Sequence, residues 1–129
     1  MIVVDSSAFI AILRREPDAE QISGVLALAT APAMAAATYL ECAIVASRVP
    51  RGRMVLDDWI VARGITVLPV DHRLAQIAAD AFARYGKGRH PAGLNFGDCF
   101  AYALARSLNA PLLSKGEDFA RTDVLRAVA

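Results

Sequence analysis

The chain alternates short apolar runs with longer segments of helical periodicity, and this alternation limits the folds that it can adopt. Residues 1–4 form a run rich in β-branched side chains, which indicates a buried strand. Shorter or weaker runs at 33–36, 66–70, 111–114 and 124–128 indicate further strands. Between these runs apolar residues recur at helical spacing. We therefore expect helices over residues 8–15, 17–29, 39–49, 54–63, 73–85 and 99–108.

Short strands that alternate with helices predict an α/β fold. A continuous apolar strand has to be covered on both faces, so the pattern predicts a three-layer sandwich: a central, mostly parallel sheet of four or five short strands flanked by helices. Right-handed crossovers would connect the strands, and the functional site of such a sheet lies at the carboxyl ends of its strands. The whole chain, residues 1–129, fits a single domain.

Bulk composition excludes several classes of protein without naming a partner. An apolar fraction of 56% and a net charge of +1 describe a core-forming chain, so any case for nucleic-acid binding must come from local clusters. Cys42 and Cys99 lie far apart in apolar runs, which argues against a disulfide scaffold or a zinc knuckle. There is no basic leader and no run near the roughly 20 apolar residues that span a bilayer. We expect a cytoplasmic protein with no membrane partner.

Four acidic residues stand at the ends or in the middle of apolar segments. Asp5 follows the first predicted strand and Asp98 opens an apolar helical segment, so each would serve as a helix N-cap worth about 1 kcal/mol. Asp118 follows a late turn, where solvent would satisfy it. Glu41 is harder to explain, because its helical segment is apolar almost all round. Such a helix is expected to be buried, and an unpaired buried carboxylate is costly.

Taken together, the four acids favour a metal site over four unrelated structural roles. Strand ends and helix starts converge at one edge of a parallel sheet, where the carboxylates would repel one another and their pKa values would rise. A divalent cation removes this repulsion, and Mg²⁺ or Mn²⁺ prefers carboxylate and water oxygens. No cluster of histidine or cysteine suggests zinc instead. Such an ion suits phosphodiester hydrolysis, because it activates water and stabilises charge on phosphate oxygens.

The ordered set of acids and their neighbours resembles the PIN-domain family of ribonucleases. The matching segments are residues 3–7 (Val-Val-Asp-Ser-Ser), Glu41 on an early helix, residues 95–98 (Asn-Phe-Gly-Asp) and residues 112–119 near the end. The stretch at residues 85–103, which contains Gly-Lys-Gly and Gly-Asp-Cys, is especially similar to VapC-type toxins of toxin–antitoxin pairs. The resemblance covers essentially the whole chain in the right order.

The resemblance implies a fold, a reaction and a set of partners. The fold is a PIN-like sandwich, and the reaction is metal-dependent endoribonuclease cleavage of single-stranded RNA. The implied partners are the RNA substrate, a second copy of the chain in a homodimer, and a small VapB-like antitoxin that blocks the active groove and binds DNA. We place the antitoxin groove around Ile10, Leu13 and the second predicted helix. The RNA target is not readable from the chain.

The resemblance also implies a set of site residues. Four carboxylates would form an Mg²⁺ or Mn²⁺ site and serve as the catalytic residues: Asp5, Glu41, Asp98 and Asp118. Ser6 would lie beside the metal through its hydroxyl, and Ser114 would help to hold the site. The fourth acid stays open between Asp118 and the adjacent Glu117, because this turn varies in length among such proteins.

A glycine- and proline-rich loop at residues 86–93 carries a cluster of basic side chains. Lys87, Arg89 and His90 lie on a backbone that glycines make adaptable, which suits contacts to RNA phosphates. A solvated surface loop without a ligand explains the same residues equally well.

Two other functions remain open at this stage. A catalytically weak PIN module would bind RNA or a protein partner without metal-dependent cleavage. Phosphotransfer on a similar α/β scaffold is the other. A receiver domain needs a phosphoacceptor at the end of a middle strand, where Asp71 looks instead like a helix cap. A haloacid-dehalogenase-type phosphatase needs Asp-x-Asp near the start, where Ser7 takes the second place.

Overall fold

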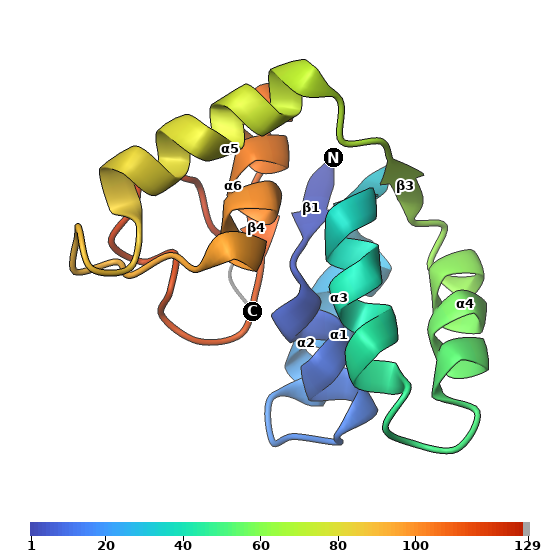
Figure 1. The fold of residues 1–129 in the computed structure, drawn as a ribbon. Helices are drawn as coiled ribbons and strands as arrows, with labels where there is room; N and C mark the ends of the chain where they lie inside the picture. Colours follow the sequence, from blue (N-terminus) through green and yellow to red (C-terminus); the bar gives the residue numbers. More distant parts are fainter. Residues whose placement is uncertain (128–129) are drawn as a thin grey trace.

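Four short parallel strands form the centre of the structure (Figure 1). The computed structural model describes residues 1–127. Within them, one sheet has the order β3-β2-β1-β4, and all neighbouring strands are parallel. The strands are β1 (Ile2–Val4), β2 (Pro32–Ala35), β3 (Thr66–Leu68) and β4 (Leu112–Leu113). The predicted parallel sheet is confirmed.

The register of the sheet brings the carboxyl ends of its strands together. In β1, Val3 pairs with Ala33 of β2 on one side and with Leu112 of β4 on the other. Ala33 pairs in turn with Thr66 of β3. Because all four strands run in one direction, the chain leaves each of them at the same edge, and Asp5 follows β1 there.

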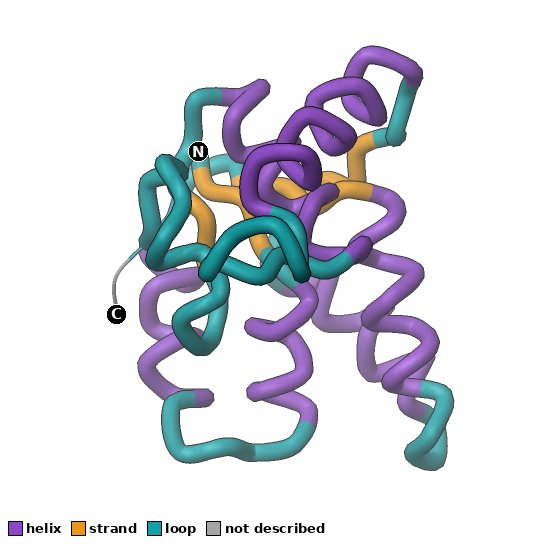
Figure 2. The backbone as a smooth tube through the Cα atoms, turned by 60° about the vertical axis from the view of Figure 1, so that its left-hand side comes forward, coloured by secondary structure: helices purple, strands orange, loops and turns teal. Residues whose placement is uncertain are grey.

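Helices cover both faces of this sheet, as Figures 1 and 2 show. The helices of the described part are α1 (Ser6–Leu13), α2 (Ala19–Leu28), α3 (Ala36–Ala46), α4 (Gly52–Ala62), α5 (His72–Tyr85) and α6 (Phe96–Leu108). The α5–α6 pair forms one layer and α1 to α4 form the other. The three-layer prediction is therefore confirmed. No helix within residues 1–127 is long and apolar enough to cross a membrane.

Neighbouring residues of β1 belong to opposite layers of the core. Val3 and Val4 are both fully buried, but Val3 packs with α5 and α6 whereas Val4 packs with α1, α2 and α3. Side chains alternate between the two faces of a strand, so a strand covered on both faces needs an unbroken apolar run. Cys42 and Cys99 are buried free thiols, one in each layer.

Helix α3 differs from the prediction in its start and in its burial. It begins at Ala36 and not at residue 39 as expected, so Thr38 is a fully buried residue of its first turn. The expectation of a helix buried on every side is also wrong. Leu40 is 58% exposed and Ile44 is 55% exposed, and together they leave one apolar stripe of α3 on the surface.

The strand predicted over residues 124–128 is reduced to a single β-bridge in the structure. Instead of a strand over residues 124–128, Arg126 forms one isolated parallel bridge with Leu112. Two backbone hydrogen bonds hold this bridge, from Leu112 to Leu125 and from Ala127 to Leu112, each 2.8 Å long. Residue 128 lies outside the described residues.

Candidate metal centre

Asp5 is buried at the carboxyl end of β1, where α1 begins. Its N–H donates to the carbonyl of Leu113 at 2.9 Å, which ties it to β4. Its Oδ2 accepts two hydrogen bonds from Ser7, from the N–H at 3.1 Å and from the hydroxyl at 2.6 Å, so Asp5 is the N-cap of α1. Its Oδ1 is buried without a hydrogen-bond partner among the described residues. Capping therefore uses only one of the two carboxylate oxygens.

Glu41 reaches the same region from the middle of α3. Its carboxylate lies so close to Gly97 that a Cβ built on Gly97 would stand 2.0 Å from Glu41 Oε2. The carboxylate fits here only because residue 97 has no side chain. In the part of the chain that the structure describes, Glu41 Oε1 is buried and unpartnered. Such an oxygen is costly in a purely structural role.

Asp98 lies in the first turn of α6, which packs against β1 and α3. The expectation that Asp98 caps this helix is wrong, because Asn95 is the N-cap. Asn95 Oδ1 accepts from the Asp98 N–H at 2.9 Å, and Asp98 Oδ2 accepts from the Asn95 N–H at 3.0 Å. This reciprocal capping box fixes the half-buried carboxylate of Asp98 within electrostatic reach of Asp5 and Glu41.

The position of the fourth acid favours Asp118 over Glu117. The charge of Asp118 raises the pKa of both Asp5 and Asp98, so it lies within electrostatic reach of the cluster. Glu117 has a side chain that is 84% exposed, and it pairs with Arg126 at 3.5 Å. Its carboxylate is thus engaged elsewhere, on the solvent side of the turn.

The three more buried acids have pKa values above their ordinary ones, as expected for carboxylates brought together. Burial, followed by the charges of Asp5 and Asp98, raises the pKa of Glu41 from 4.5 to about 7. Burial is also the main cause that raises the pKa of Asp98 from 3.8 to about 6. Burial raises the pKa of Asp5 although hydrogen bonds from Ser7 act in the opposite direction. The cluster thus resists carrying its full negative charge without a cation.

The donor set fits a hydrated divalent ion. Asp5 Oδ1 and Glu41 Oε1 are hard oxygen donors with no hydrogen-bond partner in residues 1–127. No three acidic, histidine or cysteine side chains of those residues already stand within reach of one ion. Mg²⁺ keeps several waters and takes only one or two carboxylates directly, so it does not need a preformed cage.

Ser7, which was not among the predicted site residues, makes a hydrogen bond to Asp5 through its hydroxyl. The hydroxyl that binds Asp5 belongs to Ser7 and not to Ser6. Ser114 directly follows β4 and is half-buried. A signal for Ser7 was present, because a residue two places after an Asp N-cap is where the cap finds its donors.

The basic loop has a defined conformation. The N–H of Lys87 donates to Leu94 at 2.8 Å, which closes the loop at its base. The Arg89 guanidinium lies 5.8 Å from the ring centroid of Phe82. His90 is turned into the loop, since its Nδ1 accepts from the Ala92 N–H at 3.0 Å. Lys87 and Arg89 are exposed, and His90 is half-buried.

Comparisons with known proteins agree with this fold. The PIN domain family matches residues 2–125. Ribonuclease VapC of Mycolicibacterium smegmatis is 51% identical over 125 residues, which are 95% of this chain and 96% of that protein. The crystal structure of Mycobacterium tuberculosis VapC20, a Sarcin-Ricin loop cleaving toxin, has a TM-score of 0.80 at 16% identity and covers 100% of both chains. A toxin–antitoxin complex from Klebsiella pneumoniae has a TM-score of 0.70 at 16% identity, over 95% of this chain and 93% of that one.

A parallel α/β sandwich with an acidic cluster at the carboxyl edge of its sheet defines the class of protein, a PIN-type domain. The chain belongs to the PIN-domain family, and its sequence relatives within that family are VapC ribonucleases. The resemblance stated from the sequence is therefore confirmed. PIN ribonucleases generally depend on a divalent metal, in agreement with the oxygen donors described above.

Proposed function

We propose that the chain is a metal-dependent endoribonuclease that acts as the toxin of a type II toxin–antitoxin module. The observation that carries this proposal is the convergence of Asp5, Glu41 and Asp98, from three different elements, with two buried carboxylate oxygens that have no partner within residues 1–127. Family membership and the VapC ribonuclease relatives support the same function.

The metal would be Mg²⁺, with Mn²⁺ as the alternative, held directly or through water by four carboxylates: Asp5, Glu41, Asp98 and Asp118. A bound ion of this kind supplies an activated water and stabilises negative charge on the phosphate oxygens. The chain's own part is to hold the oxygens in place. Asp5 is fixed by its cap, Asp98 by its capping box, and Glu41 by the space beside Gly97. The raised pKa values favour metal binding at neutral pH over lower pH.

RNA is the proposed substrate, and Lys87 and Arg89 are its proposed phosphate contacts. Both lie on the exposed loop that leads from α5 to α6, the helix that carries Asp98. Cations on a loop next to the acidic site would hold the RNA backbone against the charge repulsion of the carboxylates. His90 shapes this loop through its bond to Ala92, and its other ring nitrogen is the proposed RNA contact.

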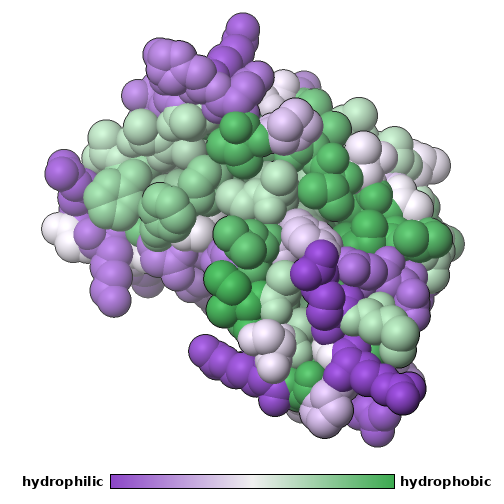
Figure 3. All heavy atoms as spheres, turned by 45° about the vertical axis from the view of Figure 1, so that its right-hand side comes forward, coloured by the Kyte–Doolittle hydropathy of each residue, from purple (hydrophilic) through white to green (hydrophobic). Residues whose placement is uncertain are grey.

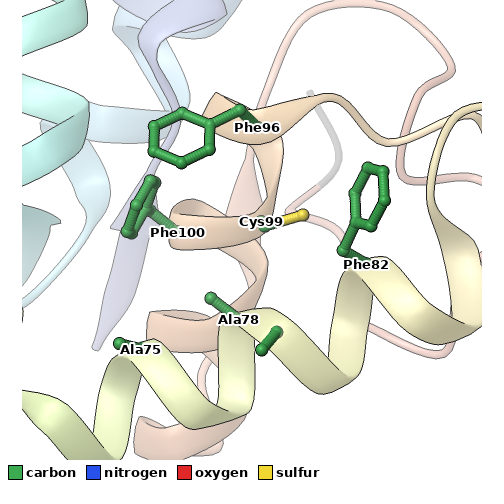
Figure 4. A pocket seen from close by; sticks show the side chains of 7 residues that line it. Ala75, Ala78, Phe82, Phe96, Cys99 and Phe100 are labelled. Carbon is green, nitrogen blue, oxygen red and sulfur yellow. The ribbon is translucent and has the colours of Figure 1, made fainter.

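A homodimer is proposed on the apolar face between α5 and α6. A cavity of about 410 Å³ opens there, lined by Ala75, Ala78, Ala79, Phe82, Phe96, Cys99 and Phe100. Figure 4 shows the sulfur of Cys99 on α6 facing Phe82 of α5, with Phe96 and Phe100 side by side. The side chain of Phe96 is 80% exposed. Exposed apolar area of this kind marks an interface, and Figure 3 shows further apolar surface between hydrophilic clusters.

The second proposed partner is a VapB-like antitoxin, placed along α1 and α2 where Ile10 and Leu13 are half-buried. The Klebsiella pneumoniae complex shows that a protein of this fold is found with an antitoxin. A cytoplasmic location is also proposed, because an RNA substrate and an antitoxin of this type would be met there, and no membrane partner is proposed.

The alternative is a PIN module that binds RNA without turnover. Nothing in the site favours it, because all four acids lie in or near the cluster. Phosphotransfer is not supported, because Asp71 caps α5 by accepting a hydrogen bond from the Leu74 N–H at 2.8 Å.

The proposal is tested with purified protein freed of any partner, titrated with Mg²⁺ and Mn²⁺ on structured and single-stranded RNAs. Cleavage that requires metal, is stopped by EDTA and is lost in Asp98→Asn is the expected result. RNA binding without cleavage, by folded protein that binds metal, would favour the alternative.

A further inference from the structure

The Ser7 side chain joins two segments of the candidate metal centre that are far apart in the sequence. Its hydroxyl lies 2.6 Å from Asp5 Oδ2 and 2.9 Å from the backbone nitrogen of Lys115. Lys115 belongs to the turn that follows β4 and leads to Asp118. One hydroxyl therefore bridges the first and the last acid-bearing segments.

The chemistry of a hydroxyl fixes the direction of both bonds. Ser7 has one hydroxyl proton, and the Lys115 N–H can only donate. Ser7 Oγ therefore accepts from Lys115 and donates its proton to the Asp5 carboxylate. A hydrogen bond to a charged acceptor is about twice as strong as a neutral one, and the 2.6 Å distance agrees with that type.

Both donors of Ser7 bind the same oxygen of Asp5. The N–H and the hydroxyl both reach Oδ2, at 3.1 Å and 2.6 Å. The carboxylate is thereby held against rotation, and Oδ1 is left as the oxygen without a partner among the described residues. Ser7 thus decides which of the two oxygens of Asp5 is available to a ligand.

A second contact holds the same turn from the other side. Lys115 Nζ lies 2.6 Å from Glu16 Oε2 and 3.4 Å from Asp18 Oδ1, both in the connection between α1 and α2. The Lys115 backbone is bound by Ser7 and its side chain by this connection. The turn is therefore attached at two points before it reaches Asp118.

We propose that Ser7 is a positioning residue of the metal centre, which orients Asp5 and sets the distance between Asp5 and the turn carrying Asp118. This inference rests on the proposed metal site. It differs from ordinary helix capping, because the Ser7 N–H already caps α1 with Asp5. A variant without the Ser7 hydroxyl keeps that backbone bond and therefore keeps α1. It loses the hydrogen bonds that join Asp5 to the turn at Lys115.

The test measures Mn²⁺ binding to the metal-free protein by isothermal titration calorimetry, without RNA. Ser7→Ala is expected to weaken Mn²⁺ binding by about 10- to 100-fold, as is typical when a partner of a metal ligand is removed. Ser7→Thr keeps a hydroxyl, so its Mn²⁺ affinity is expected to stay within about threefold of the parent's. Ser7→Val has the shape of Ser7→Thr but no hydroxyl, so its Mn²⁺ affinity is expected to match that of Ser7→Ala. Ser47→Ala is the matched control, because the exposed Ser47 hydroxyl donates to the nearby Ile44 carbonyl at 2.6 Å, away from the acids.

The outcomes separate this inference from the proposed function. If the parent protein binds no Mn²⁺, the metal centre itself is wrong and Ser7 loses its role with it. If the parent binds Mn²⁺ and Ser7→Ala binds it equally well, the function stands and the inference is overturned, whether or not the melting temperature falls. If Ser7→Ala does not fold, the pair Ser7→Thr and Ser7→Val decides, and equal affinities overturn the inference.

Discussion

The carboxylate of Glu41 lies in the space that a side chain on Gly97 would need. A Cβ on Gly97 would stand 2.0 Å from Glu41 Oε2 and 2.4 Å from its carboxyl carbon. The close approach joins α3 to the first turn of α6, one residue before Asp98. Glycine at this position thus belongs to the site, although it carries no chemical group of its own.

Gly97→Ala is expected to separate folding from function. The atoms that the new methyl group meets are the end of a flexible side chain, so Glu41 can swing away while the helix stays intact. Alanine is also favoured over glycine in a helix by about 1 kcal/mol, which offsets part of the strain. We expect a melting temperature near that of the parent together with at least about a tenfold loss of metal affinity, measured by calorimetry.

Gly24→Ala is the matched control for this change. Gly24 lies in α2 with nothing within 4 Å of its added Cβ, so the variant should gain up to about 1 kcal/mol of stability and keep its metal affinity. Equal metal affinity in Gly97→Ala and Gly24→Ala would show that the Glu41 position is not part of the metal centre.

Asp5→Asn is expected to abolish cleavage without unfolding the protein. Asn is as good an N-cap as Asp, so α1 keeps its start, and the neutral side chain removes a buried charge. We expect metal-dependent cleavage to fall by roughly a hundredfold or more, since each factor of ten in rate corresponds to about 1.4 kcal/mol of lost transition-state stabilisation. In EDTA, the melting temperature should equal or exceed that of the parent. A folded Asp5→Asn protein with full activity would remove Asp5 from the mechanism.

The metal-free protein is expected to lose stability as the pH rises from about 4.5 to about 7. In the folded state the pKa of Glu41 is raised to about 7 from 4.5, and that of Asp98 to about 6 from 3.8. At a pH between the unfolded-state and folded-state pKa values, the folded protein therefore binds more protons than the unfolded chain. The stability of the folded state is greatest below the unfolded-state pKa and declines as the pH rises through the folded-state pKa. Metal binding needs the ionised carboxylates and should reverse this trend.

Thermal melts from pH 4.5 to 8, in EDTA and in excess Mn²⁺, check this prediction. Glu41→Gln should flatten the decline seen in EDTA, because Glu41 has the higher folded-state pKa of the two acids. A melting temperature in EDTA that rises across this range would contradict the assignment of raised pKa values to the cluster.

Phe96→Asp is expected to dissociate the proposed homodimer. Phe96 is 80% exposed at the first position of α6, where an acidic residue is favoured by the helix dipole, so the fold should persist. A charge placed in an apolar interface cannot be buried without a partner. Sedimentation velocity should show a dimer for the parent and a monomer for the variant. Val61→Asp, at a position that is 79% exposed on α4, should remain a dimer. A parent that sediments as a monomer would refute the dimer.

The layers of the fold and the acids of the site could be predicted because each depends on local sequence. Unbroken apolar runs such as Val3 and Val4 occur only in strands covered on both faces, and parallel strands bring their carboxyl ends together. Asp5 at such an end and Glu41 in an apolar helix therefore stood out by residue type alone.

The remaining features depend on distances across the fold. Leu40 and Ile44 were expected to be buried because they are apolar. The sequence pattern does not show which elements cover a helix, and within residues 1–127 this side of α3 is exposed. The bond from Lys115 to Ser7 spans 108 residues, and no local pattern predicts it. The close approach of Glu41 to Gly97 also joins segments that are far apart in the sequence, so no local pattern shows that Gly97 leaves space for a carboxylate.

The paired change Lys87→Gln and Arg89→Gln is expected to weaken RNA binding without changing metal affinity. It is best measured in an Asp98→Asn background, where the RNA is not cleaved. Each lost phosphate contact on a single strand should lower the slope of log affinity against log salt by about 0.7, so the pair should lower it by about 1.4. Arg63→Gln, an exposed cation after α4, is the control and should leave the slope unchanged. An unchanged slope in the paired variant would mean that this loop is a solvated surface and that the RNA lies elsewhere.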